Sequence, residues 1–271
     1  DYFGNHGHYD QGNVEVFRDE PLLTEAGAYV GGFSGSNFRM DFYRKSVSHN
    51  TVLVVDPDDP SDEGGQRVYM NQSLGTLPDY LADPGAETGD IIAYSQGPEV
   101  CYLKADLTAA YPRDRVQRLT RELAWVADRY LVVRDRVVLA VEGFIPKVLW
   151  HCPVYPEVGK SGFTLKRGGS RVAFQLLDPG ARKVGWVEGY RVGDKLWEMP
   201  RVPEYSDPCV GRVEVVGGTG PLEQEFIQVL DVAAQGAGSG PSQLSRAPEG
   251  VEIRLPDGRR LLLAEEGARL R

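Results

Sequence analysis

Two of the four histidines in this 271-residue chain lie two positions apart, at His6 and His8. In extended backbone, residues at this spacing project from the same face, so the two imidazoles would point into one space. Paired neutral imidazoles are suited to binding a metal ion or transferring a proton, and are poor components of an apolar core. The pair therefore predicts a functional site in this stretch.

A glutamate and a third histidine add possible metal ligands. Glu25 follows a predicted turn at residues 18–21, in a segment expected to fold back toward the histidine pair. His49 lies at the start of the β-branched run 48–55, which is predicted to be a strand. Two imidazoles and a carboxylate are a common zinc-binding set, completed by water or a further protein ligand.

The overall charge restricts the class of partner. A formal net charge of −9 argues against nucleic acid as the main partner, because phosphate binding needs a basic surface. An anionic sugar would need a local cationic patch that acts against the overall field. Arg39, Arg44 and Lys45 form such a patch. Tyr43 lies among them and is either a phenol for proton transfer or a packing residue.

The chain has three cysteines, Cys101, Cys152 and Cys209, and no Cys-x-x-Cys pair. This pattern indicates buried thiols and neither a zinc–thiolate site nor a disulfide framework. No apolar run approaches the roughly 18 residues of a membrane span, so no membrane partner is expected. The first residues lack a signal-peptide pattern and a methionine, which favours a fragment or a processed chain and leaves localisation open.

Short segments of alternating apolar and polar residues, separated by turn residues, predict an all-β fold with antiparallel sheets. We expect a β-sandwich domain over residues 1–232 and a flexible Ala/Gly/Ser-rich linker over 233–242. Residues 243–271 are expected to form a hairpin with an Asp-Gly turn. An isolated hairpin is marginal in water, so this one should pack on the sandwich.

The sequence resembles the heparinase II/III-like polysaccharide lyases, a family that includes alginate and oligoalginate lyases. The segments that carry the resemblance to the histidine-containing part of the family are 5–13, 22–29 and 43–52. Segments that resemble later parts of the family's β-domain are 104–111, 132–137 and 150–151. Because these segments occur in order through most of residues 4 to 230, the resemblance is far more specific than the histidine pair alone.

The resemblance implies an antiparallel β-supersandwich that follows an N-terminal α/α-toroid, with an acidic polysaccharide or oligosaccharide in the cleft between them. It also implies a periplasmic or extracellular lyase. In the family the toroid carries further catalytic groups, and we expect it to be absent from these 271 residues. We therefore expect the chain alone to be inactive or nearly so.

The resemblance also implies residue roles. His6 would be catalytic, and Zn²⁺ would be held by His8, Glu25 and His49. The family usually has aspartate at the position of Glu25, a departure that keeps the charge and moves the carboxylate by one methylene. Asp10 would orient a histidine, or replace Glu25 as a ligand if the glutamate does not reach the metal.

The implied reaction is β-elimination, which removes the C5 proton of a uronide and expels the oxygen at C4. It needs a proton acceptor within reach, and cationic or hydrogen-bonding groups where negative charge develops. His6 and Tyr43 are the predicted catalytic residues. The predicted substrate-binding residues are Asn5, Arg39, Arg44 and Lys45.

Two other functions remain open. Cupin-like metalloenzymes also present a His-x-His pair, a glutamate and a later histidine, on a β-barrel. Their glutamate follows the pair within a few residues, whereas here Glu15 lies 7 positions and Glu25 lies 17 positions after His8. The other alternative is a carbohydrate-binding β-sandwich without catalysis, in which zinc serves only stability.

Overall fold

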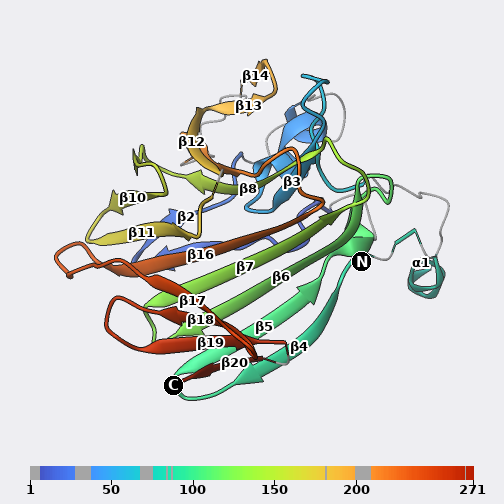
Figure 1. The fold of residues 1–271 in the computed structure, drawn as a ribbon. Helices are drawn as coiled ribbons and strands as arrows, with labels where there is room; N and C mark the ends of the chain where they lie inside the picture. The colour runs from blue at the N-terminus through green and yellow to red at the C-terminus, as the bar shows by residue number, and fades with distance from the viewer. Residues whose placement is uncertain are drawn as a thin grey trace.

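The computed structural model describes residues 7–27, 38–67, 76–83, 85–86, 88–180, 182–198, 209–265 and 267–271. Nearly all regular structure in these ranges is β-strand, and the strands pair antiparallel, as the alternating sequence pattern predicts. The sheets lie in layers and are open, with free edge strands (Figure 1). The arrangement is therefore a sandwich and not the closed barrel that the cupin alternative requires.

The central layer is an eight-stranded sheet with the strand order β4-β5-β6-β7-β16-β11-β10-β9. In chain order its strands are β4 (Asp90–Gln96), β5 (Val100–Asp106), β6 (Val116–Val126), β7 (Tyr130–Leu139), β9 (Glu157–Val158), β10 (Gly162–Arg167), β11 (Ser170–Leu177) and β16 (Glu223–Ala234). Strand β16 pairs with both β7 and β11, although it is distant from both in sequence. The sheet is therefore held together by long-range pairing.

A four-stranded sheet covers one face of the central layer. Its order is β12-β15-β8-β3, with β3 at Val52–Val55, β8 at Ile145–Cys152, β12 at Lys183–Glu188 and β15 at Gly211–Val216. The largest apolar cluster contains residues of both sheets, among them Val133, Trp150 and Val213. Because β3 is the edge strand of this sheet, the segment that precedes it lies at the rim of the sandwich.

A second four-stranded sheet packs on the opposite face of the central layer (Figure 1). Its strands are β17 (Gln243–Ala247), β18 (Gly250–Arg254), β19 (Arg260–Ala264) and β20 (Gly267–Leu270). A separate apolar cluster joins Val132 and Val229 to Ile253 and Leu261. Successive residues of a strand point to opposite faces, so the central strands carry apolar residues on both sides and read as nearly continuous apolar runs.

The linker and C-terminal region differ in detail from the sequence expectation. Strand β16 continues to Ala234, and residues 243–270 form four strands in which the expected hairpin is β18 and β19. Ser242 is held by Gln175, whose amide oxygen accepts from the Ser242 N–H at 2.7 Å and whose amide nitrogen donates to the Ser242 carbonyl at 3.1 Å. The division into a domain, a linker and a terminal unit stays a prediction.

The remaining elements are short. They are the pairs β1 (Val16–Arg18) with β2 (Glu20–Leu23) and β13 (Tyr190–Val192) with β14 (Lys195–Trp197), the π-helix η1 (Arg39–Tyr43), the 3₁₀ helices η2 (Ser46–Ser48) and η3 (Thr108–Ala110), and the α-helix α1 (Leu77–Ala82). No helix in the described ranges is long and apolar enough to cross a membrane.

The strand expected at residues 48–55 begins only at Val52, and His49 instead follows the 3₁₀ turn η2. Side-chain hydrogen bonds of two serines explain the difference. The Ser48 hydroxyl donates to the Tyr43 carbonyl at 2.7 Å, and the Ser46 hydroxyl donates to the Tyr9 carbonyl at 2.6 Å. Serine hydroxyls that bond nearby backbone favour turns over strands.

Candidate metal and active site

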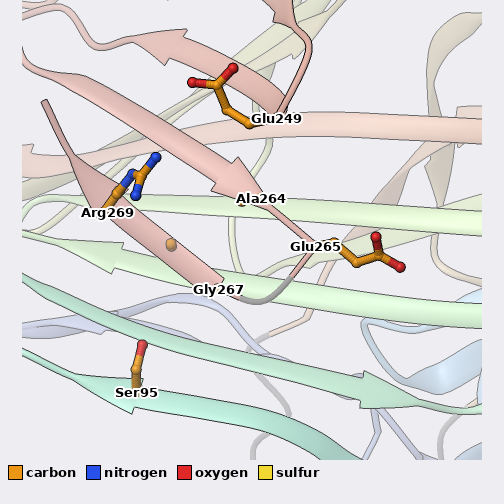
Figure 2. Close-up of a pocket in the computed structure, with 7 residues that line it drawn as sticks. Ser95, Glu249, Ala264, Glu265, Gly267 and Arg269 are labelled. Carbon is orange, nitrogen blue, oxygen red and sulfur yellow. The ribbon is translucent and has the colours of Figure 1, made fainter.

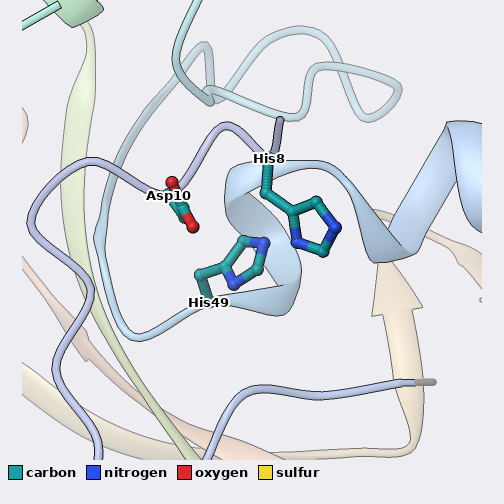
Figure 3. Close-up of side chains that lie close together, drawn as sticks. All are labelled: His8, Asp10 and His49. Atoms are coloured by element: carbon teal, nitrogen blue, oxygen red, sulfur yellow. The ribbon is translucent and has the colours of Figure 1, made fainter. Parts of the chain in front are cut away.

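His8, Asp10 and His49 form a compact group of side chains at the rim of the sandwich. Each residue offers one ligand atom, and these atoms all lie within 4.8 Å of one another. The two imidazole rings are 5.1 Å apart between centroids, and the Asp10 carboxylate lies beside them (Figure 3). Two ring nitrogens and a carboxylate oxygen that converge in this way are a suitable donor set for a divalent transition metal.

His49 is completely buried, and both of its ring nitrogens lack an aligned hydrogen bond among the described residues. Oε2 of Glu25 lies 2.7 Å from Nδ1 of His49, which is a hydrogen-bond distance. Contact with His49 lowers the pKa of Glu25. Buried polar atoms are nearly always satisfied, so Nε2 of His49, which is unpaired among the described residues, is an available donor atom for a metal ion.

His8 is surrounded by groups that keep its imidazole neutral. Burial, followed by the nearby His49, lowers the pKa of His8 to about 4, and the positive charges of Arg44 and Arg39 act in the same direction. The Tyr43 ring packs edge-on against His8, with the ring centroids 4.8 Å apart. A neutral imidazole is the form that binds metals, so this environment favours a ligand role at neutral pH.

Burial raises the pKa of Asp10, and the nearby His49 partly offsets this effect. A carboxylate with a raised pKa is destabilised in its ionised form, and a bound cation would compensate for that. A metal ion bound here would therefore stabilise the ionised form of Asp10.

Arg44 fixes the backbone that carries His8. Its side chain is buried, and Nε and Nη2 both donate to the Gly7 carbonyl, at 3.0 and 2.9 Å. The Tyr9 N–H donates to the Arg44 carbonyl at 2.8 Å. These bonds hold both neighbours of His8 against the helix η1, so Arg44 contributes structure here as well as positive charge.

The other predicted cations differ from one another. Arg39 is buried close enough to His8 to influence its pKa. Lys45 forms an ion pair with Glu63, with Nζ and Oε1 2.6 Å apart. Arg39 and Arg44 thus contribute positive charge beside the histidines, whereas the charge of Lys45 is compensated by Glu63.

Asn50 and His151 were not among the predicted site residues, and both lie beneath His49. The Asn50 side-chain oxygen accepts from the backbone N–H of His151 at 2.7 Å. The Asn50 side-chain nitrogen donates to the carbonyls of Val14 and Thr24 at 2.8 and 3.2 Å. Burial, with Arg212 and His49 nearby, lowers the pKa of His151 well below its ordinary value. The sequence signal for Asn50 was only its position next to His49.

The structure thus brings together five of the predicted residues: His8, Asp10, Glu25, Tyr43 and His49. Asn5 and His6 lie outside the described residues. The assignment of Glu25 as a metal ligand, with Asp10 orienting a histidine, stays a prediction. In the structure Asp10 belongs to the convergent group, and Glu25 contacts Nδ1 of His49.

A surface pocket of about 490 Å³ lies between β4 and the C-terminal sheet (Figure 2). It is lined by Ser95, Glu249, Ala264, Glu265, Gly267, Ala268 and Arg269. The pocket shares no residue with the histidine group and has no imidazole or thiol in its lining. We therefore place the candidate site at the histidine group.

The sequence profile of the family described as "Heparinase II/III-like, C-terminal" matches residues 1–193. Heparan sulfate lyase HepC from Pedobacter heparinus is structurally similar, with a TM-score of 0.66 and 15% identity over 96% of this chain and 37% of that chain. The heparinase III that is the BT4657 gene product gives a TM-score of 0.68 and 15% identity, over 96% of this chain and 36% of that chain.

Another heparinase III structure gives a TM-score of 0.59 and 10% identity, over 98% of this chain and 36% of that chain. The chain therefore spans little more than a third of the length of these proteins, and identities this low show a shared fold alone. A comparison with curated protein sequences found no match.

Proposed function

This chain belongs to the heparinase II/III-like family, whose C-terminal part matches residues 1–193, and we propose that it is the β-sandwich portion of a polysaccharide lyase. The substrate would be a glycan that contains uronic acid, cleaved by β-elimination. The observation that carries the proposal is the group of His8, Asp10 and His49 beside Tyr43, inside the part of the chain that matches the family.

We propose that this group binds Zn²⁺. Zinc takes nitrogen and oxygen ligands at about 2.0–2.2 Å, so donor atoms on one ion lie at most about 4 Å apart. The donor atoms now lie within 4.8 Å of one another, so the side chains would move inward when the ion binds. The buried Nε2 of His49, which has no hydrogen-bond partner among the described residues, supports the fit.

Within this site, His8, Asp10 and His49 would be ligands. Glu25 would act at the second nitrogen of His49, since metal-bound histidines commonly contact a carboxylate through their other ring nitrogen. A direct bond from Glu25 to the metal is the alternative that the family resemblance implies. Bound zinc would supply a fixed positive charge and tie the segment of His8 to the turn of His49.

For the reaction, a base takes the C5 proton, a double bond forms between C4 and C5, the C4–oxygen bond breaks, and the leaving oxygen receives a proton. We assign His6 as proton acceptor or donor and Tyr43 as a phenol that assists proton transfer. The contact between Tyr43 and His8 supports this, because it fixes the tyrosine ring next to the metal group.

Substrate binding would use Asn5, Arg39, Arg44 and Lys45. Arg39 and Arg44 provide a positive potential that already acts on His8, which is the charge an anionic sugar requires in a chain of net charge −9. Two donors of Arg44 already bond to the Gly7 carbonyl. Arg44 would therefore contribute positive potential and hold the backbone beside His8, more than it would contact the sugar directly.

We further propose that activity requires the N-terminal α/α-toroid portion. The chain corresponds to about a third of each similar lyase, which supports this division of the enzyme. The test is the ultraviolet absorbance of unsaturated uronide released from heparan sulfate, alginate and related polymers, by the chain alone and by the chain with its N-terminal portion.

We expect activity only from the longer protein, loss of activity on His6→Ala, and a strong decrease on Tyr43→Phe. Tyr94→Phe is the matched control, because Tyr94 is an exposed tyrosine on the edge strand β4. Full activity of the 271-residue chain alone would refute the toroid requirement. Zinc binding without cleavage by the longer protein would favour the non-catalytic carbohydrate-binding alternative.

A further inference from the structure

Arg121 is a buried arginine in the middle of strand β6, and its guanidinium contacts three separate parts of the chain. Nε and Nη2 donate to the two oxygens of Asp135, at 2.6 and 3.1 Å. Nη1 donates to the carbonyls of Gly12 and Asn50, at 2.5 and 2.7 Å. The side chain is only 1% exposed, so these bonds form away from water.

The two carbonyls belong to the segments that carry the metal group. Gly12 lies two residues after Asp10, and Asn50 directly follows His49. A single nitrogen of Arg121 therefore bridges the segment of His8 and Asp10 to the turn of His49. Arg121 itself contributes no ligand atom to the group.

Further polar contacts fix Arg121 from behind. Nε2 of Gln228 donates to Oδ2 of Asp135 at 3.0 Å, and Nε1 of Trp150 donates to the Gln228 side-chain oxygen at 2.8 Å. The chain of contacts runs through β6, β7 and β16 and crosses to β8 in the facing sheet. Leu119 and Val133, which lie two residues from Arg121 and Asp135, belong to the inter-sheet apolar cluster, so the polar chain crosses that core.

A buried ion pair seldom adds net stability over apolar residues of similar size, because desolvating two charges is costly. Its value lies in fixing a geometry. Gly12 shows how closely the segment approaches: it has a φ of +82°, and a Cβ there would lie 2.5 Å from a methyl carbon of Leu107. The segment therefore packs closely against Leu107, which precedes η3, and against Arg121 of β6.

We propose that Arg121 is a positioning residue for the metal group: it sets the register of the segment of His8 and Asp10 against the turn of His49. This inference rests on the proposed metal site. The bonds from Arg121 to the carbonyls of Gly12 and Asn50 form without any bound ion. Lysine cannot replace it, because an ammonium group cannot hold Asp135 with two bonds and also reach both carbonyls.

The test compares Arg121→Lys with Arg171→Lys. Arg171 is a matched control, since it is a buried arginine of the same sheet whose Nη2 lies 3.0 Å from Oδ2 of buried Asp231 and also donates to the carbonyls of Ala237 and Gly238. Backbone hydrogen exchange is measured in the presence of a chelator, and zinc affinity by competition with a chromophoric chelator.

We expect Arg121→Lys to speed exchange selectively in residues 7–15 and 46–51, and to weaken zinc binding about tenfold, the lower end of the effect of losing groups that orient metal ligands. Arg171→Lys should change neither, even where it lowers stability equally. Unchanged exchange in both segments together with unchanged zinc affinity overturns the proposal.

If Arg121→Lys does not fold, the double variant Arg121→Met/Asp135→Asn removes both charges together and avoids a buried unpaired carboxylate. The same selective exchange is expected from it, and its absence counts against the proposal. If the unaltered protein binds no zinc, the metal site fails, while the exchange measurement still decides the role of Arg121.

Discussion

Oε2 of Glu25 lies 2.7 Å from Nδ1 of His49, and this contact occupies one side of an imidazole whose other nitrogen has no hydrogen-bond partner among the described residues. Asp10, not Glu25, belongs to the convergent group with the two histidines. The two carboxylates therefore have separate relations to His49. Their roles can be separated by experiment.

Removal of the Asp10 charge should weaken zinc binding more than removal of the Glu25 charge. Glu25→Gln is expected to cost about 10–100-fold in affinity, the effect of losing a carboxylate that orients a ligand, and Asp10→Asn is expected to cost more than that. Zinc affinity is measured by competition with a chelator at neutral pH. Glu63→Gln, which alters a carboxylate that pairs with Lys45, serves as the control.

A larger loss for Glu25→Gln than for Asp10→Asn would show that the glutamate is the ligand and the aspartate its support. Equal affinity of all three variants and the unaltered protein would exclude the group as a metal site.

The metal-free protein should lose stability as the pH falls. Burial lowers the pKa of His8 from its ordinary 6.5 to about 4. The unfolded chain therefore takes up a proton near pH 6.5, whereas the folded protein does not until about pH 4, so this contribution is complete above pH 6.5 and is lost between these values. The pKa of buried His151 is also lowered, and it acts with the same sign.

Urea unfolding in the presence of a chelator, at several pH values across this window, measures the effect. His8→Gln should show a shallower dependence on pH than the unaltered protein. A residual slope should remain from His151 and from carboxylates with a lowered pKa, such as Glu25 and Asp231. Identical slopes for the two proteins would show that His8 titrates normally in the folded state.

Arg44 and Lys45 are neighbours with different expected effects. Arg44→Ala leaves the Gly7 carbonyl without two buried donors and should lower the unfolding free energy by about 1–3 kcal/mol. Lys45→Ala breaks a partly exposed ion pair with Glu63 and should cost about 0–1 kcal/mol. Unfolding midpoints in urea give both values.

In the proposed longer lyase, Arg44→Ala should also weaken zinc binding, because it frees the backbone beside His8. A substitution that raised only the KM for the polysaccharide, with stability and zinc affinity unchanged, would instead assign Arg44 to direct substrate contact.

The all-β fold was predictable because strand alternation is a local property. The return of Glu25 toward His49 follows from the turn between β1 and β2, which is a local pattern. The contact between His8 and His49 is long-range, and it was expected from a strand at His49 that the structure does not contain and from the family resemblance. Strand order was not predictable, since the insertion of β16 between β7 and β11 depends on contacts between distant segments.

The relation between Asp10 and Glu25 could not be read from the sequence for a similar reason. It depends on how the segment near Gly12 is seated against Leu107 and Arg121, which come from far along the chain. The start of β3 at Val52 depends on hydroxyl bonds of Ser46 and Ser48, one of which reaches Tyr9. The β-propensity of residues 48–55 favoured a longer strand, but these hydrogen bonds hold residues 46–48 in a turn.

Asn50 should be among the most sensitive positions for stability. It is fully buried and links three segments, because its oxygen accepts from the His151 N–H and its amide donates to the carbonyls of Val14 and Thr24. Asn50→Ala removes all three bonds, and each buried backbone group left unpaired costs about 1–3 kcal/mol. We expect a total loss of about 3 kcal/mol or more.

The control is Asn13→Ala, which removes only the oxygen that accepts from the Asn50 N–H at 2.8 Å and should cost about 1–2 kcal/mol. Both values come from urea unfolding, with an unchanged dependence on denaturant as the sign that the unfolded state is the same. Asn50 directly follows His49 and bonds to His151 in β8 and to Thr24 beside Glu25. Its loss should therefore also weaken zinc binding. Equal stabilities of the two variants would contradict this prediction. They would mean that water replaces the three hydrogen bonds of Asn50 in the variant.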